Sequence, residues 1–553
     1  MREKIIEIFK KTAPETGDIE VSVPANDSLG HYSTNVAFRL AKSQKISPVE
    51  AGQKLKEKIM ALPDADIFKK IDVVNPGFIN FWLKDEVWYG ELKEVLKRKS
   101  AYGKSRISNH KSNINLEFVS ANPTGPLTMA NARGGFLGDA LANVLEFSGH
   151  KVTREYYIND AGNQIKLLGE SVLAELGLMP RKAEHYQGEY VKEIAKQRKQ
   201  QVKKMDREIL SPELDALSSL LGHEVSRSFL GEIRKSLKNA SIKHEIWRWE
   251  AQDIRRKKLP EKVVKKFEEQ GLLIEHDGAL WLKSGIVQEK ERVVRKSSGD
   301  YTYIAVDLAY HLLKLRESDL AIDIWGADHH GNAAPLKKGL ELLGENPGKL
   351  HIILMQLVRF IKDGKEIKIS KRAGNFVLLD DLLKEVGADV ARFLFLMHAP
   401  ETHMDFDLAL AKERSMKNPV YYVQYAFVRC GAIIQKVSSI KYQVSSKKNL
   451  KLLNTTEDLM LIRELSRFPE MVEDTARDYQ VHRLTRYTTD VAKLFHNFYE
   501  KERIIPALRS FKSEGGGEKD KNLAAARLEL VKATQIVLGN TLCLLGVTLP
   551  TKM

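Results

Sequence analysis

The sequence predicts an α/β Rossmann-like domain with a parallel sheet, an N-terminal α+β domain before it and a C-terminal all-α helical-bundle domain after it. Three observations predict this arrangement. Strand-like runs alternate with helical periodicity in the middle of the chain, which is typical of β-α-β units. From about residue 406 onward, long helical periodicities take over. The length of 553 residues also exceeds what one hydrophobic core serves, so about three domains are expected.

The N-terminal domain is predicted to span residues 1–105. Helical patterns such as AFRLAKSQKISPVEAGQKLKEKIM alternate there with short strand-like runs within IDVVNPGFINFWL. The stretch YGKSRISNHKS, which contains glycine, serine and lysine, follows these runs. Because such a composition is typical of exposed connections, we place the domain boundary there.

The central domain is predicted to span residues 106–405. It opens with NINLEFV, in which Ile114, Leu116 and Phe118 alternate with polar residues as in a strand. The turn-rich segment SANPTGP follows, then a helix that ends at Gly149, then the strand KVTREYYI. The runs LAIDIW, LKKGLELLG and LHIILM repeat the strand-helix-strand pattern, which predicts a parallel sheet.

Two further segments complete the predicted organisation. A highly charged, mostly helical insertion is predicted near residues 165–300, between the two halves of the α/β pattern. The helical domain is predicted to span residues 406–553, with exposed loops at SSKK and SEGGGEKDKN.

Composition excludes several classes of protein. Hydrophobic residues make up 43% and charged residues 29% of the chain, and no run approaches the about 20 apolar residues of a membrane span. The N-terminus MREKIIEIFKK does not resemble a secretory signal, so a cytoplasmic protein without membrane association is expected.

Cys430 and Cys543 lie in apolar helical contexts, where we expect buried thiols with structural roles. The formal net charge of +15 favours polyanionic partners.

Two segments have the residue types expected for nucleotide chemistry. Residues 120–131, SANPTGPLTMAN, lie between a strand and a helix N-terminus, where backbone N–H groups and the helix dipole favour a phosphate. In KIKISKRAGN, Lys368, Lys371 and Arg372 surround Ser370 and could neutralise charge on a leaving pyrophosphate, although a lysine-rich loop is more often simply solvated. The sequence has neither a Walker A pattern nor a G-x-G-x-x-G fingerprint, which disfavours a P-loop ATPase and a dehydrogenase.

Together these segments resemble the HIGH-like motif and the KMSKS-like loop of class I aminoacyl-tRNA synthetases. The arginyl-tRNA synthetase family resembles the chain through LEFVSANPTGPL, REYYINDAGNQI, YTYIAVDLAYHL, IWGADHHGN, KISKRAGNFVLLDDLL and NPVYYVQYA, in the family's order. GHYSTNVAFRLAK is similar to the family's appended tRNA-binding domain, and the segment from FHNFYEKERI to LLGVTLPTKM resembles its anticodon-binding helical domain. The resemblance therefore covers nearly the whole chain.

The resemblance implies an arginine–tRNA ligase. Its partners would be L-arginine, ATP and tRNA(Arg), with Mg²⁺ as part of the ATP substrate complex, no tightly bound cofactor and a monomeric protein. The arginine carboxylate would attack the α-phosphate of ATP, and a terminal ribose hydroxyl of the tRNA, usually the 2′-hydroxyl, would then take the arginyl group. Such chemistry relies on positioning and charge stabilisation, so Ser370 is not expected to be a nucleophile.

A guanidinium substrate requires fixed carboxylates and planar acceptors near the nucleotide motifs. Tyr303 and Asp307 stand four apart in a predicted helix, hence on one face, and both match arginine-contacting positions of the family. A lone Tyr-x-x-x-Asp is usually an ordinary helix surface, but the wider resemblance favours Asp307 as the guanidinium partner. Glu117 and Asn122 flank the end of the first strand and also match, although a solvated carboxylate and a turn cap are the ordinary alternatives.

The resemblance assigns most of the other site residues position by position. Asp328, His329 and His330 are interpreted as site lining, because adjacent histidines at a strand end point to opposite sides and suit a metal poorly. The predicted catalytic residues are Lys368, Ser370, Lys371, Thr128 and Asn131. The predicted ATP-binding residues are Pro123, Thr124, Gly125, Thr128, Asn131, Lys368 and Lys371. The predicted arginine-binding residues are Glu117, Ser120, Asn122, Asn131, Tyr303, Asp307, Asp328 and His330. The predicted tRNA-binding residues are Tyr421, Tyr422 and Tyr425, because aromatic rings could stack on the bases of a single-stranded anticodon loop. Helical spacing makes a core role equally plausible for each of them.

The HIGH-like motif departs from the family pattern. It reads Thr128, Met129, Ala130, Asn131, and so lacks both histidines and the glycine. The Asn131 amide can donate a hydrogen bond as an imidazole does, but without the charge of a protonated histidine. The alternative function is therefore a catalytically impaired, synthetase-like RNA-binding protein. A class I synthetase for another amino acid is a second alternative, which Tyr303 with Asp307 and the motif order disfavour.

Overall fold

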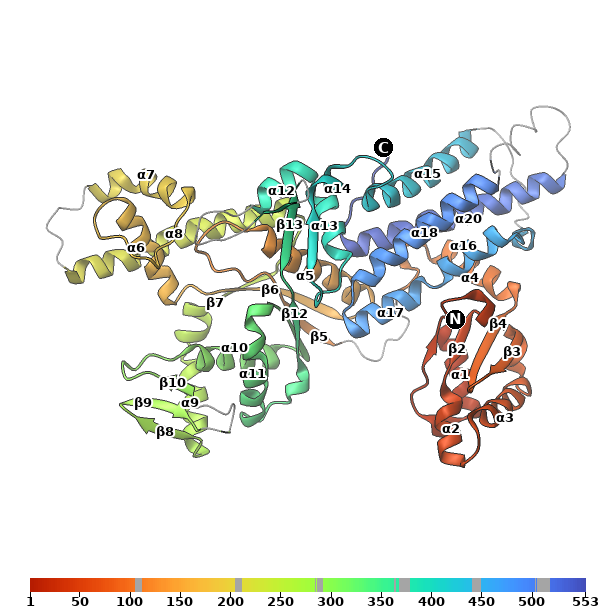
Figure 1. The fold of residues 1–553 in the computed structure, drawn as a ribbon, viewed down its shortest axis with the longest axis horizontal. Helices are drawn as coiled ribbons and strands as arrows, with labels where there is room; N and C mark the ends of the chain where they lie inside the picture. Colours follow the sequence, from red (N-terminus) through yellow and green to blue (C-terminus); the bar gives the residue numbers. More distant parts are fainter. Residues whose placement is uncertain are drawn as a thin grey trace.

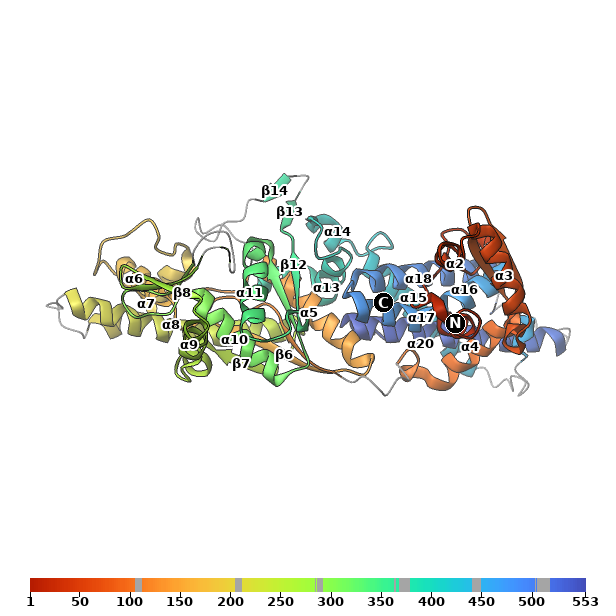
Figure 2. The ribbon, with the colours of Figure 1, turned by 90° about the horizontal axis from the view of Figure 1, so that it is seen from below.

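The structure is a computed structural model that describes residues 1–104, 112–203, 211–283, 285, 292–362, 365–367, 378–439, 449–502, 504 and 518–553. Figures 1 and 2 show an elongated molecule with the parallel sheet in its middle. The N-terminal domain lies beside the C-terminal helices at one end, and the helices of the predicted insertion extend to the other end (Figure 2). The predicted fold class, an α/β domain with an N-terminal α+β and a C-terminal all-α domain, is confirmed.

The central sheet has five parallel strands. They are β5 (Asn113–Glu117), β6 (Lys151–Ile158), β7 (Ile246–Trp249), β11 (Leu320–Gly326) and β12 (Leu350–Met355), in the order β12-β11-β5-β6-β7. The chain runs outward from β5 to β7 and then returns to β11 and β12 on the other side of β5. The pair β5 and β11 is therefore a topological switch point, and ligands of open α/β sheets bind at the carboxyl ends of such strands.

Two helices cover β5 from opposite faces. Helix α5 (Met129–Phe147) packs Gly138 directly against the Phe118 ring, at a distance that leaves no room for a Cβ atom. Helix α10 (Tyr303–Glu317) covers the other face. Consequently Asn115 and Glu117 are only 3% and 6% exposed. The alternating pattern predicted the strand correctly, but its polar side chains enter a buried network rather than solvent.

The glycine predicted to end α5 does so. Gly149 has a φ of 98°, and its N–H donates to the Glu146 carbonyl. The His150 N–H donates to the Leu145 carbonyl. This Schellman arrangement stops the helix at Phe147, two residues before the glycine.

The predicted insertion begins with three helices and later combines helices with short strands. The three helices are α6 (Asn163–Glu175), α7 (Glu189–Lys203) and α8 (Ser211–Asn239). The chain then adds β7 to the parallel sheet and passes through a short π-helix (Glu250–Arg255) and α9 (Leu259–Glu269). A separate antiparallel sheet β10-β9-β8 follows, built from β8 (Leu273–His276), β9 (Ala279–Leu282) and β10 (Arg292–Arg295). The segment is mostly helical, as expected, but its four short strands were not predicted, because four residues are too few to show a periodicity.

The remainder of the central region closes the sheet and leads to the C-terminal helices. Helix α11 (His330–Leu342) joins β11 to β12. A small sheet β14-β13-β15 is formed by β13 (Val358–Lys362), β14 (Lys365–Ile367) and β15 (Met404–Asp407). The neighbouring helices are α12 (Leu379–Val386), α13 (Ala388–Leu396) and α14 (Leu408–Lys412).

The N-terminal domain contacts the C-terminal domain directly. Its helices are α1 (Arg2–Thr12), α2 (Val36–Gln44), α3 (Pro48–Met60) and α4 (Asp85–Arg98). Its antiparallel sheet β1-β2-β4-β3 is formed by β1 (Val21–Ser22), β2 (Tyr32–Thr34), β3 (Phe68–Val74) and β4 (Phe78–Leu83). The Tyr32 hydroxyl donates to Glu470 at 2.8 Å, and the Tyr89 hydroxyl donates to the Leu453 carbonyl at 3.0 Å.

The C-terminal domain is a bundle of long helices. They are α15 (Pro419–Ser439), α16 (Thr456–Ser466), α17 (Phe468–Asp478), α18 (His482–Lys501) and α20 (Glu518–Leu545). Within the described residues, Asp520–Leu545 is long and apolar enough to cross a membrane, but 72% of its most apolar stretch is buried inside the protein. Because α20 packs against α15 and α18, it is the core helix of this bundle.

Several sequence predictions need correction or lie outside the described residues. Cys430 is buried as expected, but Cys543 is exposed, because the last turn of α20 buries the leucines around it instead. Residues 518–522 of the predicted loop SEGGGEKDKN form the start of α20. The rest of that loop, the SSKK segment and most of the predicted boundary at YGKSRISNHKS lie outside the described residues.

Candidate functional site

The loop that leaves β5 begins with an unusual backbone turn. Val119 and Ser120 have φ angles of 70° and 36°, in the left-handed region that L-residues, and β-branched ones above all, rarely adopt. The Tyr157 N–H donates to Ser120 Oγ at 3.0 Å and ties the turn to β6. Backbone strain of this kind persists only where surrounding contacts impose it, and it often occurs at functional sites.

Two buried side chains hold the residues on either side of this turn. The Tyr156 hydroxyl donates to the Ala121 carbonyl at 2.7 Å, and His244 Nε2 lies 3.2 Å from the Phe118 carbonyl. Burial lowers the pKa of His244 to about 4, so its ring is neutral near pH 7. In the tautomer that matches this contact, Nε2–H donates to the carbonyl.

Thr128 and Asn131 form a pair at the N-terminus of α5. Asn131 Oδ1 accepts from the Thr128 N–H at 3.0 Å and from the Thr128 hydroxyl at 2.9 Å. Because the oxygen is occupied, the amide is oriented with its Nδ2 donors free of partners within the described part of the chain. The helix N-terminus therefore presents side-chain donors together with its dipole, an arrangement that suits a phosphate.

The other residues predicted to bind ATP lie in the same loop or outside the described residues. Pro123 and Thr124 are buried, and Gly125 lies beside the Tyr190 ring. The Asn122 amide donates to Gln164 at 2.6 Å, which ties the loop to α6. Lys368, Ser370 and Lys371 all lie in the segment 368–377, outside the described residues.

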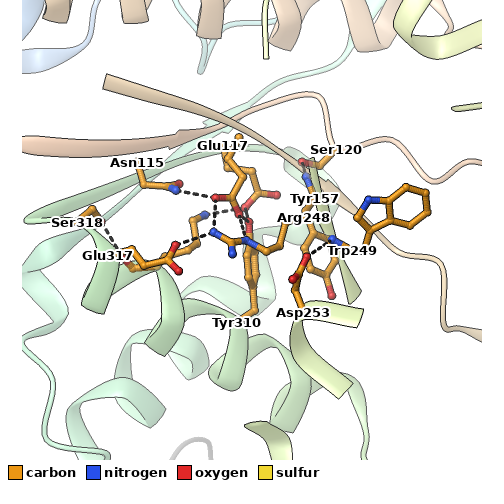
Figure 3. A network of polar contacts seen from close by, with 12 residues as sticks. Asn115, Glu117, Ser120, Tyr157, Arg248, Trp249, Asp253, Tyr310, Glu317 and Ser318 are labelled. Carbon is orange, nitrogen blue, oxygen red and sulfur yellow. Dashed lines mark hydrogen bonds and ion pairs between the residues drawn. The ribbon is translucent and has the colours of Figure 1, made fainter. Parts of the chain in front are cut away.

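A network of buried charges lies under the carboxyl ends of β5 and β11. Lys314 is 0% exposed and donates to Glu117 at 2.7 Å and to Asp323. The Tyr310 hydroxyl donates to Glu117 at 2.8 Å, as Figure 3 shows, and His311 Nε2 lies 2.7 Å from Asp323. Glu117, predicted to bind arginine, is thus already paired with an internal cation.

The pKa values of this network follow from its geometry. Burial lowers the pKa of Lys314, but Asp323, Glu117 and Glu155 raise it more, so the pKa lies above its usual value and the ammonium stays charged. Burial raises the pKa of Asp323, but Lys314 and His311 outweigh it and lower the pKa to about 2. The Lys314 ammonium and the Asp323 carboxylate are therefore both ionised at neutral pH.

The network continues from β5 to β6 and β7 (Figure 3). Glu155 accepts from Tyr310 at 2.7 Å, from Asn115 at 2.8 Å and from Arg248 at 3.2 Å. Arg248 also donates to Glu317 at 2.6 Å. The carboxylate of Glu155 is thereby neutralised by an arginine as well as by hydroxyl and amide donors.

Asp307 differs from its acidic neighbours. It is partly buried on α10, and its carboxylate forms no ion pair or side-chain hydrogen bond within the described part of the chain. Burial raises the pKa of Asp307 to about 6, and the carboxylates of Glu250 and Glu117 add to this effect, whereas His311 and His329 oppose it. A carboxylate that lacks a cation beside other acidic groups is a site for a cationic ligand.

Within the described part of the chain, the other residues predicted to bind arginine form no hydrogen bond or ion pair with Asp307. Tyr303 is the first residue of α10, one turn before Asp307, and is 62% exposed. Asp328 and His330 are exposed and follow β11, in a short 3-10 helix and at the start of α11 rather than at the strand end itself. The described residues contain no cluster of three His, Cys, Asp or Glu side chains arranged for a metal.

The three tyrosines predicted to bind tRNA lie on α15, in the C-terminal domain. The Tyr422 ring packs against His496 at 4.8 Å between centroids, and the Tyr425 ring stacks on the same histidine at 5.8 Å. These two rings contribute to packing between α15 and α18. Tyr421 is partly exposed.

Sequence reasoning missed the internal cations of the site. Along α10, Tyr303, Asp307, Tyr310 and Lys314 recur at spacings of four, three and four, which is one face of a helix. This row of polar residues in the sequence could have predicted that Tyr310 and Lys314 belong to the site. The partners Glu155 and Arg248 carried no such signal, because they come from strands that meet only in the sheet.

Comparison with known proteins adds three family matches. Residues 1–83 match the arginyl tRNA synthetase N terminal domain, residues 91–395 the catalytic domain of class I (R) tRNA synthetases, and residues 423–553 the DALR anticodon binding domain. The arginine–tRNA ligase of Carboxydothermus hydrogenoformans is 39% identical over 97% of the chain and 94% of that relative. That of Citrifermentans bemidjiense is 38% identical over 98% of the chain and 96% of that relative. The Thermus thermophilus arginyl-tRNA synthetase structure has the same fold, with a TM-score of 0.78 and 22% identity over 100% of both chains.

Proposed function

Because the chain belongs to the arginyl-tRNA synthetase family and is an arginine–tRNA ligase, we propose that it activates arginine at the carboxyl edge of β5 and β11. Its substrates are L-arginine, ATP and tRNA. An oxygen of the arginine carboxylate attacks the α-phosphorus of ATP and displaces pyrophosphate. The terminal 2′-hydroxyl of tRNA(Arg) then attacks the arginyl carbonyl and displaces AMP.

Each domain of the chain has its own role in this proposal. Residues 1–105 contact the body of the tRNA, residues 106–405 perform catalysis with residues 165–300 as an insertion, and residues 406–553 read the anticodon. Tyr421, Tyr422 and Tyr425 contribute to that reading, with Tyr421 the best placed, because its two neighbours pack on His496. The protein acts as a monomer in the cytoplasm.

The observation that carries the proposed arginine site is the Asp307 carboxylate, which pairs with no cation in the described part of the chain. Glu117 is held by Lys314 and Tyr310, so Asp307 supplies the negative charge for the guanidinium. Glu117, Ser120, Asn122, Tyr303, Asp328 and His330 line the site around the rest of the substrate. The positive charge of Lys314 offsets the negative charge of Glu117. The charge of Asp307 is therefore the one left to balance a guanidinium.

ATP is placed along the loop that follows β5. Pro123, Thr124 and Gly125 approach the nucleotide with their backbone, while Thr128 orients Asn131 so that its amide donates to a phosphate. Lys368 and Lys371 neutralise the departing pyrophosphate, and Ser370 supports the loop between them. ATP enters with Mg²⁺ as one substrate complex.

Asn131→Asp tests the role of this amide. The change keeps the acceptor for Thr128 but removes both N–H donors and adds a negative charge beside the phosphates. We expect kcat/KM for ATP to fall about a hundredfold to a thousandfold, the usual cost of one lost transition-state donor. Steady-state aminoacylation with varied ATP measures this. Asn131→His, which keeps a donor, is the control and should stay within about tenfold of the natural protein; equal losses in both variants would contradict the donor role.

Aminoacylation of tRNA(Arg) with labelled arginine tests the function as a whole. We expect charging that depends on ATP and arginine, is absent with lysine as the amino acid, and is lost in Lys371→Ala but retained in the exposed control Lys349→Ala. Binding of tRNA without charging would instead establish the alternative, a catalytically impaired RNA-binding relative. Charging with another amino acid would contradict the arginine assignment.

A further inference from the structure

A cavity beside the end of α8 is surrounded by cations and lies away from the candidate arginine site. Its volume is about 370 Å³, and its lining includes Arg234, Lys238, Lys243 and Trp247 but no carboxylate. Ile242, which also lines it, packs against Gly135 of α5. The cavity is therefore on the α5 face of the sheet, whereas the network around Glu117 and the candidate arginine site lie on the α10 face.

The guanidinium of Arg234 lies over an aromatic ring at this cavity. It lies 4.4 Å from the centroid of the Trp247 ring, and the other face of Trp247 stacks on the buried Tyr156 at 4.6 Å with an interplanar angle of 19°. Such a stack restricts the long arginine side chain before any ligand arrives. Its N–H edge remains available for the two parallel hydrogen bonds that a phosphate accepts.

The positive charge of the cavity is not cancelled by its surroundings. Within the described part of the chain, Arg234, Lys238 and Lys243 form no ion pair. The nearby carboxylate of Asp139 is bonded to the buried Arg392 at 2.7 Å. Glu245 pairs with Arg154 at 3.5 Å.

A structural role for the cations explains only part of this arrangement. Lys238 lies in the last turn of α8, where a cation favours the negative end of the helix dipole. Arg234 is a turn earlier, and Lys243 lies beyond the helix, yet both face the same cavity. Three convergent cations of this kind are the recognition chemistry of a phosphate.

We propose that this cavity binds a phosphodiester of the tRNA backbone close to the acceptor end. The inference rests on the proposed function, since the sheet domain must receive the 3′ end of the RNA. The three cations are exposed, so a backbone that passes over the surface can reach them, and the net charge of +15 favours such a partner. Arg234 supplies a bidentate contact, and the two lysines supply point charges.

The test compares tRNA binding by three proteins. Arg234→Gln/Lys238→Gln/Lys243→Gln removes the cations of the cavity, and Lys235→Gln removes one exposed charge next to it on α8 that does not line the cavity. Fluorescence anisotropy with labelled tRNA(Arg) gives Kd as a function of salt. We expect the triple variant to raise Kd about tenfold near 0.15 M salt and to lower the slope of log K against log salt by about 1 to 2, with Lys235→Gln unchanged.

Further measurements separate this inference from its rivals. At saturating tRNA, KM for arginine and ATP should not change in the triple variant, since none of the residues placed at the arginine and ATP sites lines the cavity. Equal tRNA affinity in the triple variant and Lys235→Gln would overturn the proposal. Inorganic phosphate offers a second test. If phosphate raised the melting temperature of the natural protein but not of the triple variant, and both proteins bound tRNA with equal affinity, the cavity would hold a free anion and the proposal would be overturned. Failure of the natural protein to charge tRNA would instead refute the proposed function.

Discussion

Asp307→Asn is expected to lower kcat/KM for arginine by about a hundredfold to a thousandfold. The amide keeps the size of the carboxylate but loses the charge that pairs with the guanidinium, and removing one member of a buried charged pair typically costs about 2–5 kcal/mol. Among the described residues, no cation forms an ion pair with the Asp307 carboxylate, so its charge is available to the substrate. Steady-state aminoacylation with varied arginine at saturating ATP and tRNA measures the effect.

The same variant should remove a pH dependence. The pKa of Asp307 is raised to about 6, so the free carboxylate becomes protonated as the pH falls below that value, and the apparent affinity for arginine should fall with it. In Asp307→Asn this fall between about pH 7 and 5 should disappear. Asp300→Asn, an exposed carboxylate upstream of α10, is the matched control and should keep both the activity and the pH profile. An unchanged KM for arginine in Asp307→Asn would refute the proposed contact.

Lys314→Met is expected to destabilise the protein by about 3–5 kcal/mol, the usual cost of removing one partner from a buried ion pair. The change leaves Glu117 and Asp323 buried without the cation that now compensates both. Chemical denaturation, followed by a probe in the parallel-sheet domain, measures the loss.

Two further variants test whether the loss of stability comes from the buried ion pairs. Lys338→Met removes an exposed lysine that pairs with Glu341 on α11, and its effect should stay within about 0.5 kcal/mol. Lys314→Met combined with Asp323→Asn should recover part of the lost stability, because one uncompensated charge is removed. A loss below about 1 kcal/mol in Lys314→Met would show that the network is not a source of stability.

The segments of the chain that carry strong local patterns could be predicted from sequence. The strand KVTREYYI and the glycine stop of α5 at Gly149 appear where expected, because strand alternation and C-cap geometry are local properties. The strands β7 to β10 were missed, since four residues show too little periodicity to distinguish them from helix. Cys543 was assigned to the interior because local hydropathy does not tell which side of an apolar helix faces the bundle.

By itself, the sequence determined the α/β architecture, the helical C-terminal domain and the segment 120–131 between a strand and a helix. Only the tertiary structure decided that Glu117 is paired internally while Asp307 has no ion-pair partner among the described residues. Tyr310 and Glu117 are 193 positions apart, and they meet because β5 and the helix before β11 pack across the switch point of the sheet. The sequence shows that a residue carries a carboxylate, but it does not show whether a cation lies beside that carboxylate. Its partner, and hence its charge and function, depends on which distant strands and helices the fold brings together.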